Sequence, residues 1–195
     1  MQNYSRNSAL EKELSEIMLK YRVLTEEEVI YYLQRKLTHQ PPSSVIPGIE
    51  QLVRSGLVFR SGMNLALGPK EKIERDIAIA FRVFAECFDT ESRDIPADWP
   101  SSIIFTKKED KHPCRITVCS DPEKDGNMSS LMNKRWDGHF HEIIVGINFS
   151  AKELSEKLIP NSKVTFAEYR AARPLIDTPQ ITYTRLRDGR DQTED

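Results

Sequence analysis

The sequence predicts an α+β fold with two domains: first helices and a β-hairpin, then a small α+β domain with a mostly three- to four-stranded sheet. Apolar residues recur every three or four positions between residues 8 and 54, which is typical of amphipathic helices. Short runs rich in β-branched residues follow between residues 102 and 166, which is typical of strands. We expect the domains to span residues 1–69 and 70–187, followed by a charged, disordered tail at 188–195.

The composition excludes several classes of protein. With 38% hydrophobic and 30% charged residues, the chain has the balance of a soluble globular protein. No run approaches the roughly 18 apolar residues that a membrane span requires, and residues 1–8 lack the apolar core of a signal peptide. The three cysteines are odd in number and show no CxxC spacing, which argues against a disulfide framework. We therefore expect a cytoplasmic protein with no membrane partner.

Two helices are expected at the start of the first domain. The first runs from Ser8 to Tyr21, where the apolar residues fall on one stripe. Thr25 is followed by three glutamates, of which the last is Glu28. This is the spacing of a capping box, in which each of the two side chains bonds the other residue's amide. The second helix therefore begins after Thr25 and continues to about Lys36.

A third helix is expected after the turn that contains Pro41 and Pro42. Ser43 or Ser44 would cap it, and Pro47 is tolerated because it lies in the first turn. Its expected buried face consists of Ile46, Ile49, Leu52 and Val53.

A hairpin follows the third helix, which ends at Gly56. Residues 57–60 and 63–67 are expected to form two short strands about the two-residue turn Ser61-Gly62. Three helices followed by a hairpin is the order of a winged helix-turn-helix. The segment IEQLVRSGLVFRSGMNLALGP, residues 49–69, resembles the third helix and wing of bacterial winged-helix proteins. The resemblance implies the fold but not the partner, because members of that superfamily bind DNA or proteins.

The second domain is expected to order its elements as helix, three strands, helix, strand. Ser150 and Glu153 have the spacing of a capping box at the second of these helices. The expected elements are a helix at 70–88, a loop at 90–100, strands at 102–106, 114–119 and 141–147, a helix at 151–158 and a strand at 163–166. This order is also that of the PD-(D/E)xK nuclease core, which the second domain resembles in outline.

The nuclease motif itself is incomplete. Such nucleases hold Mg²⁺ with an Asp near the second strand and with an acid two residues before a Lys on the third strand. Glu109 and Asp110 precede the second strand, but both residues after Glu142 are isoleucines, so the lysine is missing. We predict no catalytic residues and a protein that is not an enzyme. A metal-dependent nuclease remains an alternative, which a cluster of Glu86, Asp110 and Glu142 would support.

The combination of a winged helix with a catalytically empty nuclease-like domain resembles the replication-relaxation type of protein found on plasmids and conjugative elements of Gram-positive bacteria. The resemblance rests on the order of elements along the chain. It implies a DNA-associated accessory protein that serves the replication or transfer of a mobile element.

Neither of two candidate metal motifs is complete. His139 and His141 have a spacing that puts two imidazoles on one face of a strand, with His112, Cys114 and Cys119 nearby in sequence. No Cys or His pair repeats at the spacing of a zinc finger, however. Residues 121–126 match the first half of a calcium loop, but Met132 stands where a glutamate is needed. We expect no metal and no cofactor.

The expected DNA contacts lie on the third helix and the wing: Ser43, Ser44, Gln51, Arg54, Arg60 and Asn64. Glu50 opposes this assignment, because a carboxylate repels phosphate unless it accepts a bond from cytosine. The net charge of −2 also limits affinity, although residues 1–70 hold nine Lys or Arg against seven Asp or Glu. Useful affinity would therefore need dimerisation.

Two main hypotheses for function result. The first is a non-enzymatic DNA-binding accessory or regulatory protein. The second is an adaptor that uses the winged helix for assembly with a protein partner or as a homodimer. A basic patch joining Arg54, Arg60, Lys70 and Lys72 would favour DNA, whereas an apolar patch of more than a few hundred Å² would favour a protein partner.

Overall fold

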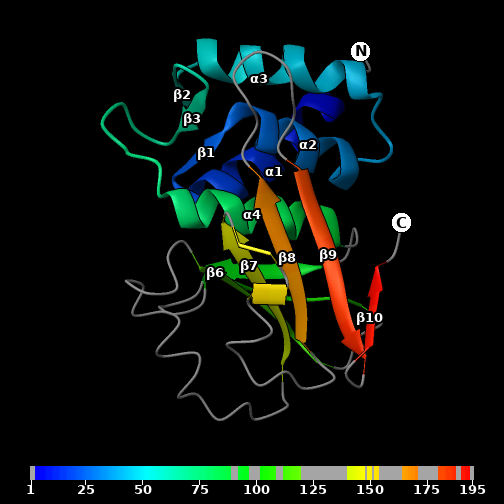
Figure 1. The fold of residues 1–195 in the computed structure, drawn as a ribbon. Helices are drawn as coiled ribbons and strands as arrows, with labels where there is room; N and C mark the ends of the chain where they lie inside the picture. Colours follow the sequence, from blue (N-terminus) through cyan, green and yellow to red (C-terminus); the bar gives the residue numbers. More distant parts are fainter. Residues whose placement is uncertain are drawn as a thin grey trace. The chain divides into compact units, whose positions relative to one another are not determined.

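The computed structural model describes ten stretches of the chain and divides it into two compact units, Met1–Glu91 and Ser92–Asp195 (Figure 1). The described residues are 3–88, 92–96, 102–108, 112–119, 140–147, 149–150, 152–153, 164–170, 180–187 and 190–193. The fold is α+β, and each unit contains one sheet, of three strands in the first unit and seven in the second. The second sheet is therefore larger than the three or four strands expected from the sequence.

The first unit combines helices with a small antiparallel sheet. Its elements are α1 (Asn3–Tyr21), β1 (Val23–Thr25), α2 (Glu26–Lys36), the 3-10 helix η1 (Pro42–Ser44), α3 (Val45–Arg54), β2 (Phe59–Ser61), β3 (Asn64–Ala66) and α4 (Arg75–Cys87). The strands lie in the order β1-β3-β2, so the hairpin that follows α3 pairs with the short strand between α1 and α2. The apolar stripe expected on the first helix is confirmed, because Leu10, Leu14, Ile17, Met18 and Tyr21 are all buried.

The third helix differs from expectation in its cap and in its buried face. The side chains of Val45, Ile49 and Leu52 are buried, whereas Ile46 is 49% exposed. Ser44 occupies the N-cap position of α3, as expected, but its side chain makes no capping hydrogen bond and its hydroxyl instead donates to the carbonyl of Pro41 at 2.7 Å. The reason is that η1 leads directly into α3, which leaves Ser44 in a helical backbone conformation instead of the extended one that a capping side chain needs.

The hairpin is confirmed, with its turn shifted by one residue. Ser61 pairs with Asn64, so the two turn residues are Gly62 and Met63. Gly62 has a φ of 61°, in the left-handed region that a residue without a Cβ adopts at little cost. The expected turn, Ser61-Gly62, would have placed the serine at the first turn position.

Helix α4 belongs to the first unit, so this unit extends to Glu91 instead of ending at residue 69. The ring of Phe81 lies 4.9 Å from that of Tyr21 and 5.4 Å from that of Tyr32, measured between centroids. The ring centroid of Phe88 lies 5.0 Å from that of Tyr32. Because aromatic rings bury large areas when they pack, α4 completes the core formed by α1 and α2.

The second unit is a mixed sheet whose spatial order follows the sequence. Its strands are β4 (Arg93–Pro96), β5 (Ile103–Thr106), β6 (Cys114–Cys119), β7 (His141–Ile147), β8 (Val164–Arg170), β9 (Gln180–Arg187) and β10 (Arg190–Thr193). β6, β7 and β8 are parallel, and the remaining pairs are antiparallel. All six residues of β6 are buried, as is typical of a parallel strand in the middle of a sheet.

Two edge regions correct the sequence-based expectations. β4 lies inside the segment expected to be a loop, and β10 lies inside the tail expected to be disordered. β10 pairs antiparallel with β9, Arg190 opposite Arg187. A strand gains its hydrogen bonds from its neighbour and not from its own composition, so a polar segment is easily missed. The sequence does contain one signal for this hairpin, the Asp-Gly dipeptide at residues 188–189.

The capping box expected after β7 is present. The amide of Glu153 donates to the Ser150 hydroxyl at 3.2 Å, and the Glu153 carboxylate accepts from the Ser150 amide at 2.8 Å. Residues 152 and 153 are helical, and the remainder of the helix expected at 151–158 lies outside the described residues.

Candidate functional site

Helix α3 presents a polar edge to solvent because its opposite side is anchored in the core. Ser43, which precedes α3, and Gln51 and Arg54 on it are exposed, whereas Ser44 and Asn64 are half-buried. Among the residues that the structure describes, Arg54 has no ion-pair partner. A guanidinium at the end of α3 therefore remains available to an external anion.

Arg60, in contrast, is engaged within the protein. Its Nη1 donates to Oε1 of Glu50 at 2.8 Å, and its Nη2 donates to Oε1 of Glu26 at 2.6 Å. The hydrogen bond that Arg60 donates to Glu50, and next the one that it donates to Glu26, raise the pKa of the Arg60 guanidinium. The sequence identifies Glu50 as an acid that opposes phosphate binding, but it gives no sign of the bond to Glu26, which lies 34 residues from Arg60 along the chain.

The expected basic patch is therefore weakened at one of its four members. Lys70 and Lys72 are exposed, but Arg60 is held between two carboxylates. Between the two lysines, Glu71 pairs with Arg22, and this hydrogen bond and the opposite charge lower the pKa of the Glu71 carboxyl. Of the four members of the expected patch, Arg54, Lys70 and Lys72 are thus exposed, whereas the charge of Arg60 is compensated by its ion pairs with the two carboxylates.

Apolar side chains are also exposed in this region. Among the described residues, four of the seven exposed large hydrophobic side chains lie between residues 46 and 63: Ile46, Leu57, Phe59 and Met63. Met63, in the hairpin turn, is 82% exposed. Such exposure is a feature of surfaces that bind other proteins.

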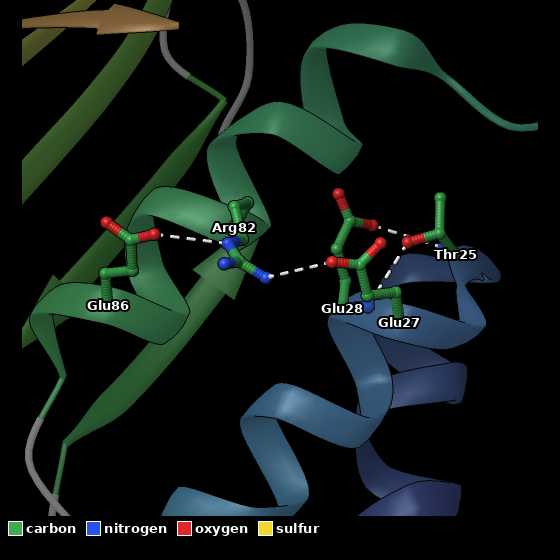
Figure 2. Close-up of polar contacts among 5 residues, drawn as sticks. All are labelled: Thr25, Glu27, Glu28, Arg82 and Glu86. Atoms are coloured by element: carbon green, nitrogen blue, oxygen red, sulfur yellow. Dashed lines mark hydrogen bonds and ion pairs between the residues drawn. The ribbon is translucent and has the colours of Figure 1, made fainter. Parts of the chain in front are cut away.

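A second polar cluster joins α2 to α4 (Figure 2). Arg82 of α4 donates from Nε to Oε1 of Glu86 at 3.2 Å, and its Nη1 lies 4.0 Å from Oε1 of Glu27. The same guanidinium lies 4.1 Å from the ring centroid of Tyr31. This arrangement satisfies a buried arginine and holds α4 against α2.

The predicted capping box of α2 is present in the same cluster (Figure 2). Thr25 and Glu28 exchange two hydrogen bonds, each 3.2 Å long. Burial of the carboxyl raises the pKa of Glu28 from its usual 4.5 to about 7, although its bonds to Thr25 and the charge of Arg82 act in the opposite direction. This acid therefore titrates near neutral pH.

Glu142, the acid considered for a nuclease site, is bonded to an arginine. Arg115 lies directly opposite Glu142 on β6 and β7 and donates from Nε at 2.9 Å and from Nη2 to the two carboxylate oxygens. Arg115 also stacks on Phe140, 4.5 Å from the ring centroid. Glu86 is bonded to Arg82, and Asp110 lies outside the described residues. The proposed acidic cluster is not supported by these contacts.

The candidate metal ligands do not come together in the part of the chain that is described. No group of three or more His, Cys, Asp or Glu side chains there could hold a metal ion. His141 Nε2 lies 2.9 Å from the Thr165 hydroxyl, and Cys114 and Cys119 are buried. His139 and the calcium-like segment 121–132 lie outside the described residues.

Comparison with known proteins identified no relative. No protein-family model, no curated protein and no solved structure shows significant similarity to this chain. Among the described helices, none combines the length and the apolar character needed to cross a bilayer.

Proposed function

We propose that this protein is a non-enzymatic DNA-binding accessory or regulatory protein, and that its first unit is a winged helix-turn-helix. The order of helix, strand, helix, helix and hairpin, with the hairpin paired to the strand after α1, supports this proposal. In such a domain α3 is the recognition helix, which enters the major groove, and the hairpin is the wing.

The observation that carries the proposal is the exposed edge of α3. Arg54 is exposed and has no ion-pair partner in the described part of the chain, and Gln51 on the same helix and Ser43, which precedes the helix, are also exposed. Arginine can bond guanine or phosphate, and serine and glutamine can contact base edges.

Binding to a mixed pool of short DNA duplexes, at about 50 and 200 mM salt, tests the proposal. We expect wild-type binding to weaken with salt and Arg54→Ala to weaken it further. Arg93→Ala is the matched control, because it removes the same charge from an exposed side chain of β4. Absence of binding at low salt, or an equal effect of both substitutions, would contradict the proposal.

The role in a mobile element rests on the resemblance to replication-relaxation proteins. A catalytically empty second unit agrees with the bonding of Glu142 to Arg115, which leaves that carboxylate occupied. Because Arg60 is paired within the protein, a single copy would neutralise few phosphates through α3 and the hairpin, so we propose that two copies bind one duplex. Light scattering of the complex would give two chains per duplex if this is correct.

A second candidate function is assembly with a protein. Four exposed apolar side chains favour this function, because exposing apolar surface to water is unfavourable and a partner would cover it: Ile46, Leu57, Phe59 and Met63. If α3 and the hairpin form a self-association surface, Phe59→Ser/Met63→Ser would shift sedimentation towards the monomer. A double variant that sediments like the wild type would count against this candidate.

A further inference from the structure

The wing arginine is bound at both ends of its guanidinium fork. Arg60 lies on β2, Glu26 begins α2, and Glu50 lies on α3, so one side chain connects three elements. The two terminal nitrogens donate to different carboxylates, at 2.6 and 2.8 Å. We call this set of three residues the Arg60 clamp.

Binding of a phosphate by Arg60 would compete with its hydrogen bonds to Glu26 and Glu50. Arginine recognises phosphate with a pair of parallel N–H groups, and the clamp engages one N–H on each of the two terminal nitrogens and fixes the direction of the guanidinium fork towards Glu26 and Glu50. The three side chains together carry a net charge of −1, since one guanidinium faces two carboxylates. The side chains of Arg60 and Glu50 are 29% and 38% exposed, so solvent screens these charges in part.

We propose that Glu26 and Glu50 act as an electrostatic brake on DNA binding by keeping Arg60 from the phosphate backbone. The inference rests on the proposed DNA-binding function and adds a regulatory device to the same surface. In the free protein, affinity for phosphate then comes from Arg54, whereas Arg60 contributes only when the clamp opens. A brake of this kind lowers non-specific binding, which depends on the number of phosphates neutralised.

The test compares salt dependence in variants of the full chain on the same mixed pool of duplexes. Glu26→Gln/Glu50→Gln keeps the shape and the acceptor oxygens of the clamp and removes both negative charges. We expect tighter binding and a plot of log K against log salt that is steeper by about one unit, the contribution of one phosphate contact. Arg60→Ala added to that variant should abolish the steeper slope, whereas Arg60→Ala alone should leave the wild-type slope unchanged.

Two controls separate this inference from simple charge removal and from misfolding. Glu11→Gln/Glu16→Gln removes two exposed acids of α1 and should change the slope less than the clamp variant. If the thermal transition shows that the double variant is unfolded, Glu50→Gln alone is the milder variant. It should also increase the affinity for DNA.

The outcomes distinguish the brake from the proposed function. If Arg60→Ala alone flattens the slope as much as Arg54→Ala, Arg60 already contacts DNA and the brake is wrong, while the DNA-binding proposal stands. The brake is also wrong if Glu26→Gln/Glu50→Gln increases DNA affinity and the salt slope no more than Glu11→Gln/Glu16→Gln does. If neither wild type nor any clamp variant binds DNA at low salt, the proposed function itself fails.

Discussion

Arg115 and Glu142 lie directly opposite each other on the parallel strands β6 and β7, and both are buried. The carboxylate, only 3% exposed, accepts hydrogen bonds from Nε and Nη2 of the arginine. The hydrogen bonds within the pair thus compensate both groups for the hydration that they lose on burial. The pair ties two central strands together and occupies the acid that a metal-dependent nuclease would use.

Breaking this pair should destabilise the protein more than replacing it. Glu142→Ala leaves a buried guanidinium without its partner, and we expect a loss of about 3–5 kcal/mol in the free energy of unfolding. Arg115→Met/Glu142→Met removes both charges and should lose much less. Urea unfolding of the two variants checks this prediction. A double variant that is as unstable as the single one would contradict the view that the loss arises from an unpaired buried charge.

Glu28 should make stability depend on pH. Its pKa is about 7 in the folded protein and 4.5 when exposed, so the folded state binds the proton more tightly. The contribution of Glu28 to stability is then largest below pH 4.5, falls by at most about 3 kcal/mol as the pH rises to 7, and is constant above that. Glu28→Gln keeps the capping oxygen and should remove this term, so that its advantage over wild type grows between pH 5 and 8. An advantage that is equal at both pH values would refute the assignment.

Truncating Phe81 should loosen α4 from the first unit. Its ring is fully buried and contacts Tyr21 and Tyr32, so Phe81→Ala should cost about 3–5 kcal/mol. Leu19→Ala is a suitable control, because Leu19 is largely exposed and should change stability by less than about 0.5 kcal/mol. Chemical denaturation followed by tyrosine fluorescence measures both. Similar losses for both variants would mean that α4 contributes little to this core.

Two glycines should respond differently to alanine. Gly62 has a φ of 61°, so Gly62→Ala places a Cβ in the left-handed region and should cost about 1 kcal/mol. Gly68 has room for a Cβ, whose nearest neighbour would be the flexible Glu71 side chain at 3.6 Å, and its φ is not positive. Gly68→Ala should therefore be neutral or slightly stabilising. Thermal melts that rank the two variants in the opposite order would contradict the turn geometry.

Local patterns predicted much of the first unit. The stripe on α1, the capping box of α2 and the hairpin depend on residues within a few positions of one another, so the sequence indicated them. The boundary after residue 69 was wrong, because the aromatic face of α4 finds its partners on α1 and α2. The exposed face of α3 was expected correctly at Gln51 and Arg54, but not the exposure of Ile46.

The sequence by itself determined where the helices and the central strands lie, because periodicity, caps and β-branched runs act over short distances. Only the tertiary structure decided which distant charges meet: Arg60 with Glu26, and Arg115 with Glu142. It also added β4, β9 and β10 to the sheet, since a strand is completed by its neighbour. Long-range pairing depends on the path of the whole chain, and that path is absent from any local pattern.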